Sequence, residues 1–384
     1  MVQWVRKYGW VVVALIGVFF IGILGRQVAS ERSAPNSSSH PAEVASNPVD
    51  PGSSLGKKMA PNFTLTDQFG KTVSLKQYRG KVVVLAFVDS KCTTICPLTT
   101  QSMVRAVQML GPKAAAHVQL VGVDANPTFT SVADVRRFSV LHGLMHSWVF
   151  LTGSSQQLKS VWSHYYVYVA VEHHVVDHTP AVYVIDSKGR ERRIFLTSTH
   201  FNVVGAQASV LAATIAKYLP HSVLPSHIPH IGYKPTNYSP SSSVTLTRLT
   251  AHGASGSLTL RPNQDRLTVF LASWAPAAYQ QMQGLNSVAK ALPHVKIVGV
   301  DVGSVEPSRN AIIPLLRRVG RLQYPIVLDP AGNLAQAYGV TNIPWMALTN
   351  AHGRVIWTHS GWLASPKILT HALSTTLKAT HSGS

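Results

Sequence analysis

An internal repeat is the strongest constraint on the fold, because three landmarks recur in the same order in both halves of the chain. The matched segments are VVVLAFVDSKC (from Val82) with LTVFLASWAP (from Leu267), VQLVGVDAN (from Val118) with VKIVGVDVG (from Val295), and TPAVYVIDSKGR (from Thr179) with IPWMALTNAHGR (from Ile343). Three ordered matches favour duplication of one structural pattern over chance. We therefore expect two domains of the same fold, which 384 residues can supply.

Each half alternates predicted strands with predicted helices. In the first half, apolar runs predict strands at 82–88, 118–123, 147–151 and 181–185, and helical periodicity predicts helices at 98–109, 131–141, 154–162 and 203–218. The sequence Asp-Ser-Lys-Gly at 186–189 predicts a hairpin turn after the last of these strands. The alternation indicates an α/β architecture, with a sheet covered by helices.

The N-terminus predicts a membrane segment. An uncharged stretch of 18 residues runs from Tyr8 to Gly25 behind Arg6 and Lys7, and it is just long enough to span a bilayer as a helix. Positive flanks stay on the cytoplasmic side, so the rest of the chain should be exported. A cleaved signal peptide is the alternative, because the small residues VAS at 28–30 offer a cleavage site. We favour a single-pass anchor in the cell membrane, with extracytoplasmic domains.

Composition suggests where the domains begin and end. The predicted divisions are a membrane anchor or signal (1–25), a flexible Ser/Pro/Ala-rich tether (26–56), a first domain (57–219), a Pro-rich linker (220–241) and a second domain (242–384).

The formal charge of +19 does not indicate a nucleic-acid partner. It reflects 34 Lys and Arg against only 15 Asp and Glu, and the excess is spread over both predicted domains. No basic run interleaved with aromatic residues appears, so we expect no nucleic acid among the partners.

Two cysteines carry the first candidate chemistry. Cys92 and Cys96 are the only cysteines of the chain, and they follow the predicted strand 82–88 where Pro97 marks the first turn of a helix. The free N–H groups at a helix N-terminus favour thiolate over thiol. A separation of four residues suits a disulfide and a soft metal ion equally well, so the spacing alone leaves both open.

A histidine far along the chain is the third element. His178, in VEHHVVDHTP, precedes the predicted strand 181–185, which should neighbour the cysteine-bearing strand. Its imidazole could complete a site of two sulfurs and one nitrogen, which suits Cu(I) better than Zn(II). Taken alone, one of 18 histidines could fall here by chance.

Residues 57–219 resemble the Sco/SenC proteins, which are thioredoxin-like copper carriers for cytochrome c oxidase assembly. The resemblance rests on APNFTLTDQFGKTVSLKQYRGKVVVLAFVDSKCTTICP, on VGVD and on VVDHTPAVYVIDSKGR. It implies that Cys92, Cys96 and His178 bind Cu(I). It also implies supporting roles for Asp177 and Asp124. Pro180 differs from most members of that family and falls at the cis-proline position of thioredoxins, so a cis Thr179–Pro180 bond is expected.

Residues 242–384 resemble the TlpA/ResA-like thioredoxin proteins more distantly. Where that family has Trp-Cys-Pro-x-Cys, this chain reads WAPAA from Trp274 to Ala278, and Ile343-Pro344 keeps the cis-proline pattern. A domain without the two sulfurs cannot exchange disulfides. Its expected roles are to dock, shield or present the first domain.

Two functions follow from these patterns. The first is an extracytoplasmic metallochaperone that delivers Cu(I) to the copper-site subunit of cytochrome c oxidase. The alternative is an enzyme, a thiol–disulfide oxidoreductase that reduces cysteines of that subunit or of a cytochrome. In that alternative Cys92 and Cys96 are the catalytic pair, His178 tunes a thiolate, and a thioredoxin-like reductant is a further partner.

Overall fold

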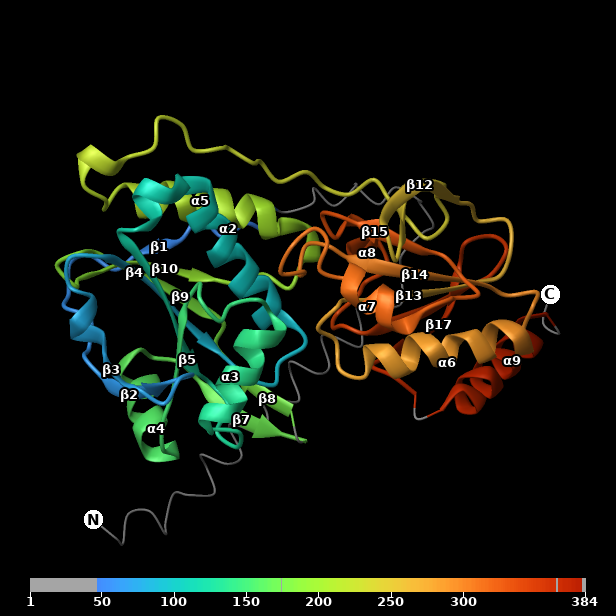
Figure 1. Cartoon of the computed structure of the whole chain (residues 1–384), viewed down its shortest axis with the longest axis horizontal. Coiled ribbons are helices and arrows are strands. Elements are labelled where there is room, and N and C mark those ends of the chain that lie inside the picture. Colours follow the sequence, from blue (N-terminus) through green and yellow to red (C-terminus); the bar gives the residue numbers. More distant parts are fainter. Residues whose placement is uncertain (1–46, 174, 364, 382–384) are drawn as a thin grey trace, which may run out of the picture. The chain divides into compact units, whose positions relative to one another are not determined.

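The computed structural model describes residues 47–173, 175–363 and 365–381, which belong to one compact unit beginning at Asn47 (Figure 1). The predicted membrane segment at 1–25 lies outside the described residues. Within them, no helix combines the length and the apolar character needed to cross a bilayer.

The first sheet has eight strands. In spatial order they are β1 (Ser53–Ser54), β10 (Glu191–Leu196), β9 (Ala181–Ile185), β4 (Val82–Val88), β5 (Val118–Asp124), β6 (Val149–Thr152), β2 (Thr64–Asp67) and β3 (Thr72–Ser74). β4, β5 and β6 are parallel, and β9 runs antiparallel to β4. The four strands predicted from apolar runs are β4, β5, β6 and β9, and the predicted hairpin turn joins β9 to β10.

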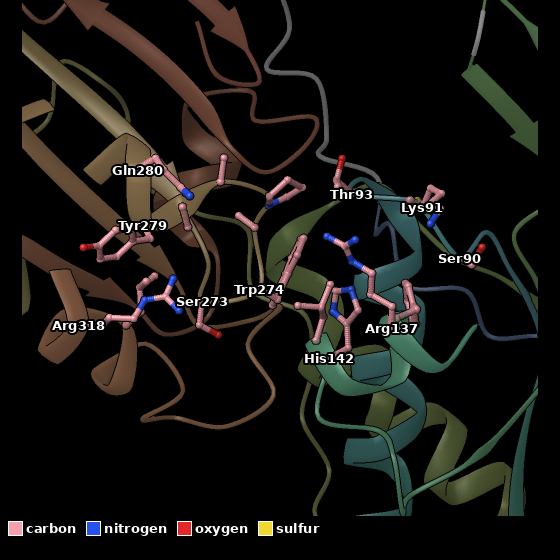
Figure 2. Close-up of a pocket in the computed structure, with 18 residues that line it drawn as sticks. Ser90, Lys91, Thr93, Arg137, His142, Ser273, Trp274, Tyr279, Gln280 and Arg318 are labelled. Carbon is pink, nitrogen blue, oxygen red and sulfur yellow. The ribbon is translucent and has the colours of Figure 1, made fainter. Parts of the chain in front are cut away.

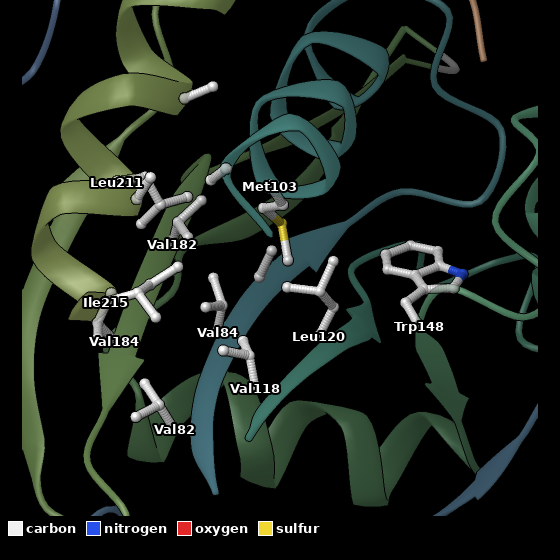
Figure 3. Packing of buried hydrophobic residues seen from close by; sticks show 14 of the residues in the cluster. Val82, Val84, Met103, Val118, Leu120, Trp148, Val182, Val184, Leu211 and Ile215 are labelled. Atoms are coloured by element: carbon white, nitrogen blue, oxygen red, sulfur yellow. The ribbon is translucent and has the colours of Figure 1, made fainter. Parts of the chain in front are cut away.

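Helices cover both faces of this sheet. They are α2 (Ile95–Ala115), α3 (Val132–Leu141), α4 (Ser155–His164) and α5 (Val204–Ala216), with 3₁₀ turns η1 (Leu75–Tyr78), η2 (Phe201–Val203) and η3 (His221–Val223). All seven residues of β4 are buried, because its even-numbered residues pack under α2, α3 and α5 and its odd-numbered residues face α4. Figure 3 shows Val82 and Val84 of β4 against Met103 of α2 and Ile215 of α5.

The second sheet has seven strands. In spatial order they are β17 (Val355–Ser360), β16 (Trp345–Thr349), β13 (Arg266–Leu271), β14 (Lys296–Val302), β15 (Ile326–Asp329), β11 (Val244–Thr250) and β12 (Gly253–Leu260). The associated helices are α6 (Ala278–Ala291), α7 (Ile313–Val319), α8 (Asn333–Ala337) and α9 (Pro366–His381).

The two sheets repeat one topology. The order β10-β9-β4-β5-β6-β2-β3 of the first corresponds strand for strand to β17-β16-β13-β14-β15-β11-β12 of the second, and every paired direction agrees. The topology therefore agrees with the sequence repeat. Assignment of the second sheet to the TlpA/ResA-like family stays a prediction.

Part of the predicted tether belongs to the first sheet instead. Ser53–Ser54 pairs with β10, and the backbone N–H and carbonyl of Asp50 bond to the side-chain amide of Gln207 in α5. Composition alone suggested a flexible segment through residue 56. Composition does not reveal this strand, because a small polar residue at a sheet edge pairs through its backbone as well as any other residue does.

The two sheets share a hydrophobic contact. Leu98 of α2, Phe201 of η2 and Val204 of α5 are buried in the same cluster as Phe270 of β13 and Val300 of β14. Arg105 of α2 also donates a hydrogen bond of 2.9 Å to the carbonyl oxygen of Gly303. The first turn of the cysteine-bearing helix therefore packs directly against the second sheet.

Candidate functional site

The loop between β4 and α2 positions the cysteines. The backbone N–H of Cys92 donates to the carbonyl oxygen of Asp89 (3.1 Å), and the Asp89 side chain accepts the N–H of Lys91 (2.8 Å). These two bonds close a tight turn where the buried strand ends. Helix α2 begins at Ile95, three residues earlier than its periodicity predicts, so Cys96 lies within the first turn.

The two sulfurs lie on either side of the helix start. Sγ of Cys92 accepts the backbone N–H of Cys96 at 3.4 Å, while the N-cap residue Thr94 makes no side-chain capping bond. Sγ of Cys92 also lies 3.2 Å from the hydroxyl of Thr94. Cys92 thus satisfies one of the free N–H groups at the start of the helix, an arrangement that favours its thiolate. Both cysteines are free thiols.

The two thiols differ in acidity. The hydrogen bond from the Cys96 side chain lowers the pKa of Cys92 to about 7, with further help from Thr94. Burial raises the pKa of Cys96 well above its ordinary value, because no water solvates its thiolate. Cys92 is therefore the sulfur that ionises first.

His178 lies beside the buried cysteine. It ends strand β8 (Val175–His178), which forms a two-stranded sheet with β7 (Val169–Glu172), and its Nε2 lies 3.6 Å from Sγ of Cys96. Its Nδ1 lies 3.2 Å from the carbonyl oxygen of Thr179. A carbonyl only accepts, so the Nδ1 proton donates, and in the neutral ring Nε2 keeps its lone pair toward the sulfur.

Burial lowers the pKa of His178, although the carbonyl of Thr179 and the charges of Asp89 and Asp177 act in the opposite direction. A neutral imidazole is the form that binds a metal ion. The structure thus brings all three predicted residues together around Cys96. In the described ranges, however, no three Cys, His, Asp or Glu side chains are already arranged to hold a metal ion.

The predicted supporting residues lie at different distances from this centre. Asp124 is fully buried, and its Oδ1 accepts the N–H groups of Ser90 (3.3 Å) and Asn126 (3.1 Å), so it supports the cysteine loop from behind. Asp177 is exposed and reaches His178 only through its charge. The carbonyl of Pro180 accepts the N–H of Thr197 at 3.0 Å.

The expected cis Thr179–Pro180 bond is wrong. Among the described residues, only Ile343–Pro344 is cis, as the pattern of the second half predicts. Thr179 instead hydrogen-bonds Tyr168 through both its backbone N–H and its hydroxyl, which ties this segment to the β7–β8 hairpin that carries His178.

Two supporting residues were missed by sequence reasoning. Asp89 holds the turn around Lys91 and Cys92, and it accepts a 2.6 Å hydrogen bond from the side chain of Asn126. Both residues follow the carboxyl ends of parallel strands, β4 and β5, where side chains from separate segments meet. Their position directly after two adjacent buried strands is the sequence signal by which both residues could have been found.

The second sheet contributes to the surroundings of the cysteine loop. The N–H of Ile343 donates a 3.1 Å hydrogen bond to the carbonyl oxygen of Thr93, between the two cysteines. Residues 273–280, which include the WAPAA segment, line a cleft together with residues 90–93 (Figure 2). In that segment Trp274 is buried and its Nε1 donates to the carbonyl of Val305 at 3.0 Å.

Fold and site together define the first domain as a thioredoxin-like α/β domain with a Cys-x-x-x-Cys pair and a histidine beside it. Residues 52–215 match the family described as SCO1/SenC, so this part of the chain is similar to SCO1/SenC domains. The match does not extend over the second sheet.

Individual known proteins are similar to parts of the chain. The chain is 32% identical over 95 residues to the SCO1 protein homolog of Bacillus subtilis, covering 24% of this chain and 49% of the relative. It is 28% identical over 111 residues to the sporulation thiol-disulfide oxidoreductase A of the same species, covering 28% and 67%. The copper-bound structure of ScoI from Bradyrhizobium japonicum is 24% identical, with a TM-score of 0.37, covering 42% of this chain and 99% of that one.

The chain spans about half the length of that SCO1 homolog. Activity, cargo and partners of the whole protein are therefore matters of proposal.

Proposed function

We propose that the protein is an extracytoplasmic copper chaperone, anchored by its N-terminal segment, that binds one Cu(I) through Cys92, Cys96 and His178. The acceptor is the copper-site subunit of cytochrome c oxidase, as the resemblance of the first domain implies. Copper is the cargo, so the site must bind Cu(I) tightly and still release it to the acceptor.

One observation carries this proposal: Nε2 of His178 lies 3.6 Å from Sγ of Cys96, whose backbone N–H is bonded to Sγ of Cys92. Two soft sulfurs and a neutral imidazole are the donor set that Cu(I) prefers. The side chains must still close around the ion. His178 lies on a small hairpin outside the main sheets, so a shift of its side chain leaves the main sheets unchanged.

Three ligands leave the ion open to an incoming fourth. A thiol or imidazole of the acceptor can bond to the metal before the ligands of this protein leave. Oxidation of Cys92 and Cys96 to a disulfide removes both thiolates, so the redox state of the pair controls loading.

An anaerobic Cu(I) titration of the reduced protein against a competing chelator tests the proposal. We expect one tightly bound ion per chain, and a loss of affinity of at least about tenfold, or about 1.4 kcal/mol, in His178→Ala. His164→Ala is the matched control, because His164 is exposed on α4. Affinity that is equal in both variants would contradict the role of His178.

The alternative function is a thiol–disulfide oxidoreductase. The observation in its favour is the asymmetry of the pair, since the pKa of Cys92 is lowered to about 7 while Cys96 is buried. A reactive, partly exposed sulfur with a buried resolving partner is typical of such enzymes. Copper binding that His178→Ala leaves unaffected, together with steady disulfide turnover, would favour this alternative.

A further inference from the structure

A cleft of about 470 Å³ lies beside Cys92, and both halves of the unit line it (Figure 2). From the first half come residues 90–93 and the end of α3, and from the second half come residues 273–280 and Arg318 of α7. This volume is typical of sites for small molecules.

The described residues that line the cleft include three cations and no acid: Lys91, Arg137 and Arg318. Lys91 is already paired with Asp134. Arg318 stacks over the ring of Tyr279 at 4.6 Å, and in the described part of the chain neither Arg318 nor Arg137 forms an ion pair. Two guanidinium groups are therefore available to an anion.

Two uncharged features of the cleft, a buried imidazole nitrogen and a helix start, also suit an anion. His142 is 3% exposed, its ring lies 4.5 Å from that of Trp274, and its buried Nδ1 has no hydrogen-bond partner within the described residues. Helix α6 begins at the cleft with Ala278, and its N-cap residue Ala277 provides no side-chain capping bond. The first N–H groups of a helix favour an anion.

The acids bonded to cleft residues do not pair with Arg137 or Arg318. Glu306 is buried and accepts both the N–H and the hydroxyl of Ser273. Asp134 is the partner of Lys91. Neither acid lines the cleft, so the charged residues that line it are all cations.

Only one of the two cysteine sulfurs is reachable from this side. Cys92 lines the cleft, whereas Cys96 is 1% exposed and does not. A ligand bound in the cleft meets Cys92 first.

We propose that this cleft binds a small thiol that carries a carboxylate, and that this thiol reduces the Cys92–Cys96 disulfide. The inference rests on the proposed function, because copper loading needs the reduced pair. It gives the cysteine-less second half a role: it supplies Arg318 and the start of α6 to the anion site.

The step is an ordinary exchange of two thiols for one disulfide. A small thiolate attacks Sγ of Cys92, the bond to Cys96 breaks, and Cys96 leaves with the electron pair and takes up a proton. A second small thiolate attacks the sulfur of the first, and Cys92 leaves as a thiolate. The products are the reduced pair and the disulfide of the small thiol.

The test measures the rate of reduction of the full-length, oxidised protein by two probes, mercaptoacetate (anionic) and cysteamine (cationic). We expect the double variant Arg137→Gln/Arg318→Gln to slow mercaptoacetate at least fivefold and cysteamine less than twofold. Comparing variants with the same probe cancels the intrinsic reactivity of each thiol. In the parent protein, 0.5 M NaCl should reduce the rate with mercaptoacetate, because salt screens exposed charges.

The matched control is Arg136→Gln/Arg317→Gln, since each of these arginines neighbours a cleft arginine without lining the cleft. Equal effects of the cleft and control variants on mercaptoacetate would overturn the proposal. The proposal would also be overturned if an acidic cysteine-containing peptide reduced the protein more than tenfold faster than mercaptoacetate, with each rate normalised to the intrinsic reactivity of its thiol. That result would assign the cleft to a protein partner. No copper is used, so this outcome is independent of the Cu(I) titration.

Discussion

The backbone N–H of Ile343 donates a hydrogen bond of 3.1 Å to the carbonyl oxygen of Thr93, so the second sheet contacts the loop between the two cysteines. Ile343 precedes the cis-proline Pro344, and Thr93 follows Cys92 directly. A half of the chain that has no cysteine thus holds the backbone beside the two cysteines of the other half.

Leu98→Ala should weaken the contact between the two halves. Leu98 is 2% exposed and lies in the core cluster of the second sheet, so its truncation leaves a cavity. We expect a loss of about 2–5 kcal/mol in the free energy of unfolding, measured by urea denaturation. Val140→Ala is the control, because Val140 is 57% exposed and should change stability by less than about 0.5 kcal/mol.

Cys96→Ala should raise the pKa of Cys92. The hydrogen bond from Cys96 is the main cause that lowers the Cys92 pKa to about 7, and burial acts against it. The pH dependence of alkylation, followed by mass spectrometry, measures this pKa. In Cys92→Ala, the remaining buried Cys96 should react far more slowly. An unchanged midpoint in Cys96→Ala would show that another group stabilises the thiolate.

Asp124→Asn should stabilise the protein at neutral pH. Burial raises the pKa of Asp124 well above its ordinary value, so the native state holds its proton more tightly than the unfolded chain. The wild type therefore loses stability as pH rises from about 4 through the native pKa, and Asn removes this loss. Thermal unfolding between pH 4 and 8 should show an advantage of Asn that grows with pH.

Asp124→Ala is the matched comparison. It removes the acceptor of the Ser90 and Asn126 N–H groups, which Asn keeps. We expect a cost of about 1–3 kcal/mol relative to Asn at every pH. Equal stability of the two variants would contradict the supporting role of this side chain.

His142→Phe should flatten the acid side of the stability profile. Burial lowers the pKa of His142 to about 3, so between about pH 6.5 and 3 the unfolded chain binds a proton that the native state does not. The wild type therefore loses stability as pH falls through this window, by up to about 1.4 kcal/mol per pH unit from this group. The Phe variant lacks this slope in denaturant titrations. A slope that is unchanged relative to His164→Ala would contradict the assignment.

Gly122→Ala and Gly299→Ala should both destabilise, because these glycines occupy equivalent places in the repeat. A Cβ on Gly122 would lie 2.5 Å from the ring of Trp148, and one on Gly299 would lie 2.4 Å from Cδ1 of Ile326. Overpacking of this kind costs about 1–3 kcal/mol. Thermal unfolding measures the loss of stability in both variants. Gly232→Ala is the control, because a Cβ at Gly232 has no atom within 4 Å.

Local patterns predict the four central strands of the first sheet and the helices that cover it. Fully buried strands such as β4 and β5 appear as continuous apolar runs, and Ser131 and Ser154 cap α3 and α4 as the start of each helical period indicates. Short edge strands such as β1 escape prediction, because backbone pairing at an edge needs no distinctive side chain. The cis-proline prediction failed at Thr179–Pro180 for a related reason: only the surrounding structure selects the isomer of an X–Pro bond.

The sequence by itself determined that two α/β halves repeat, that Cys92 and Cys96 lie at the start of a helix, and that the second half has no cysteine. These features depend on local periodicity and residue identity. Tertiary structure alone brought His178 to Cys96, 82 residues earlier in the chain, because strand pairing between β4 and β9 joins distant segments. It alone also placed Arg137 and Arg318 at one cleft, since each arginine belongs to a helix packed on a different sheet.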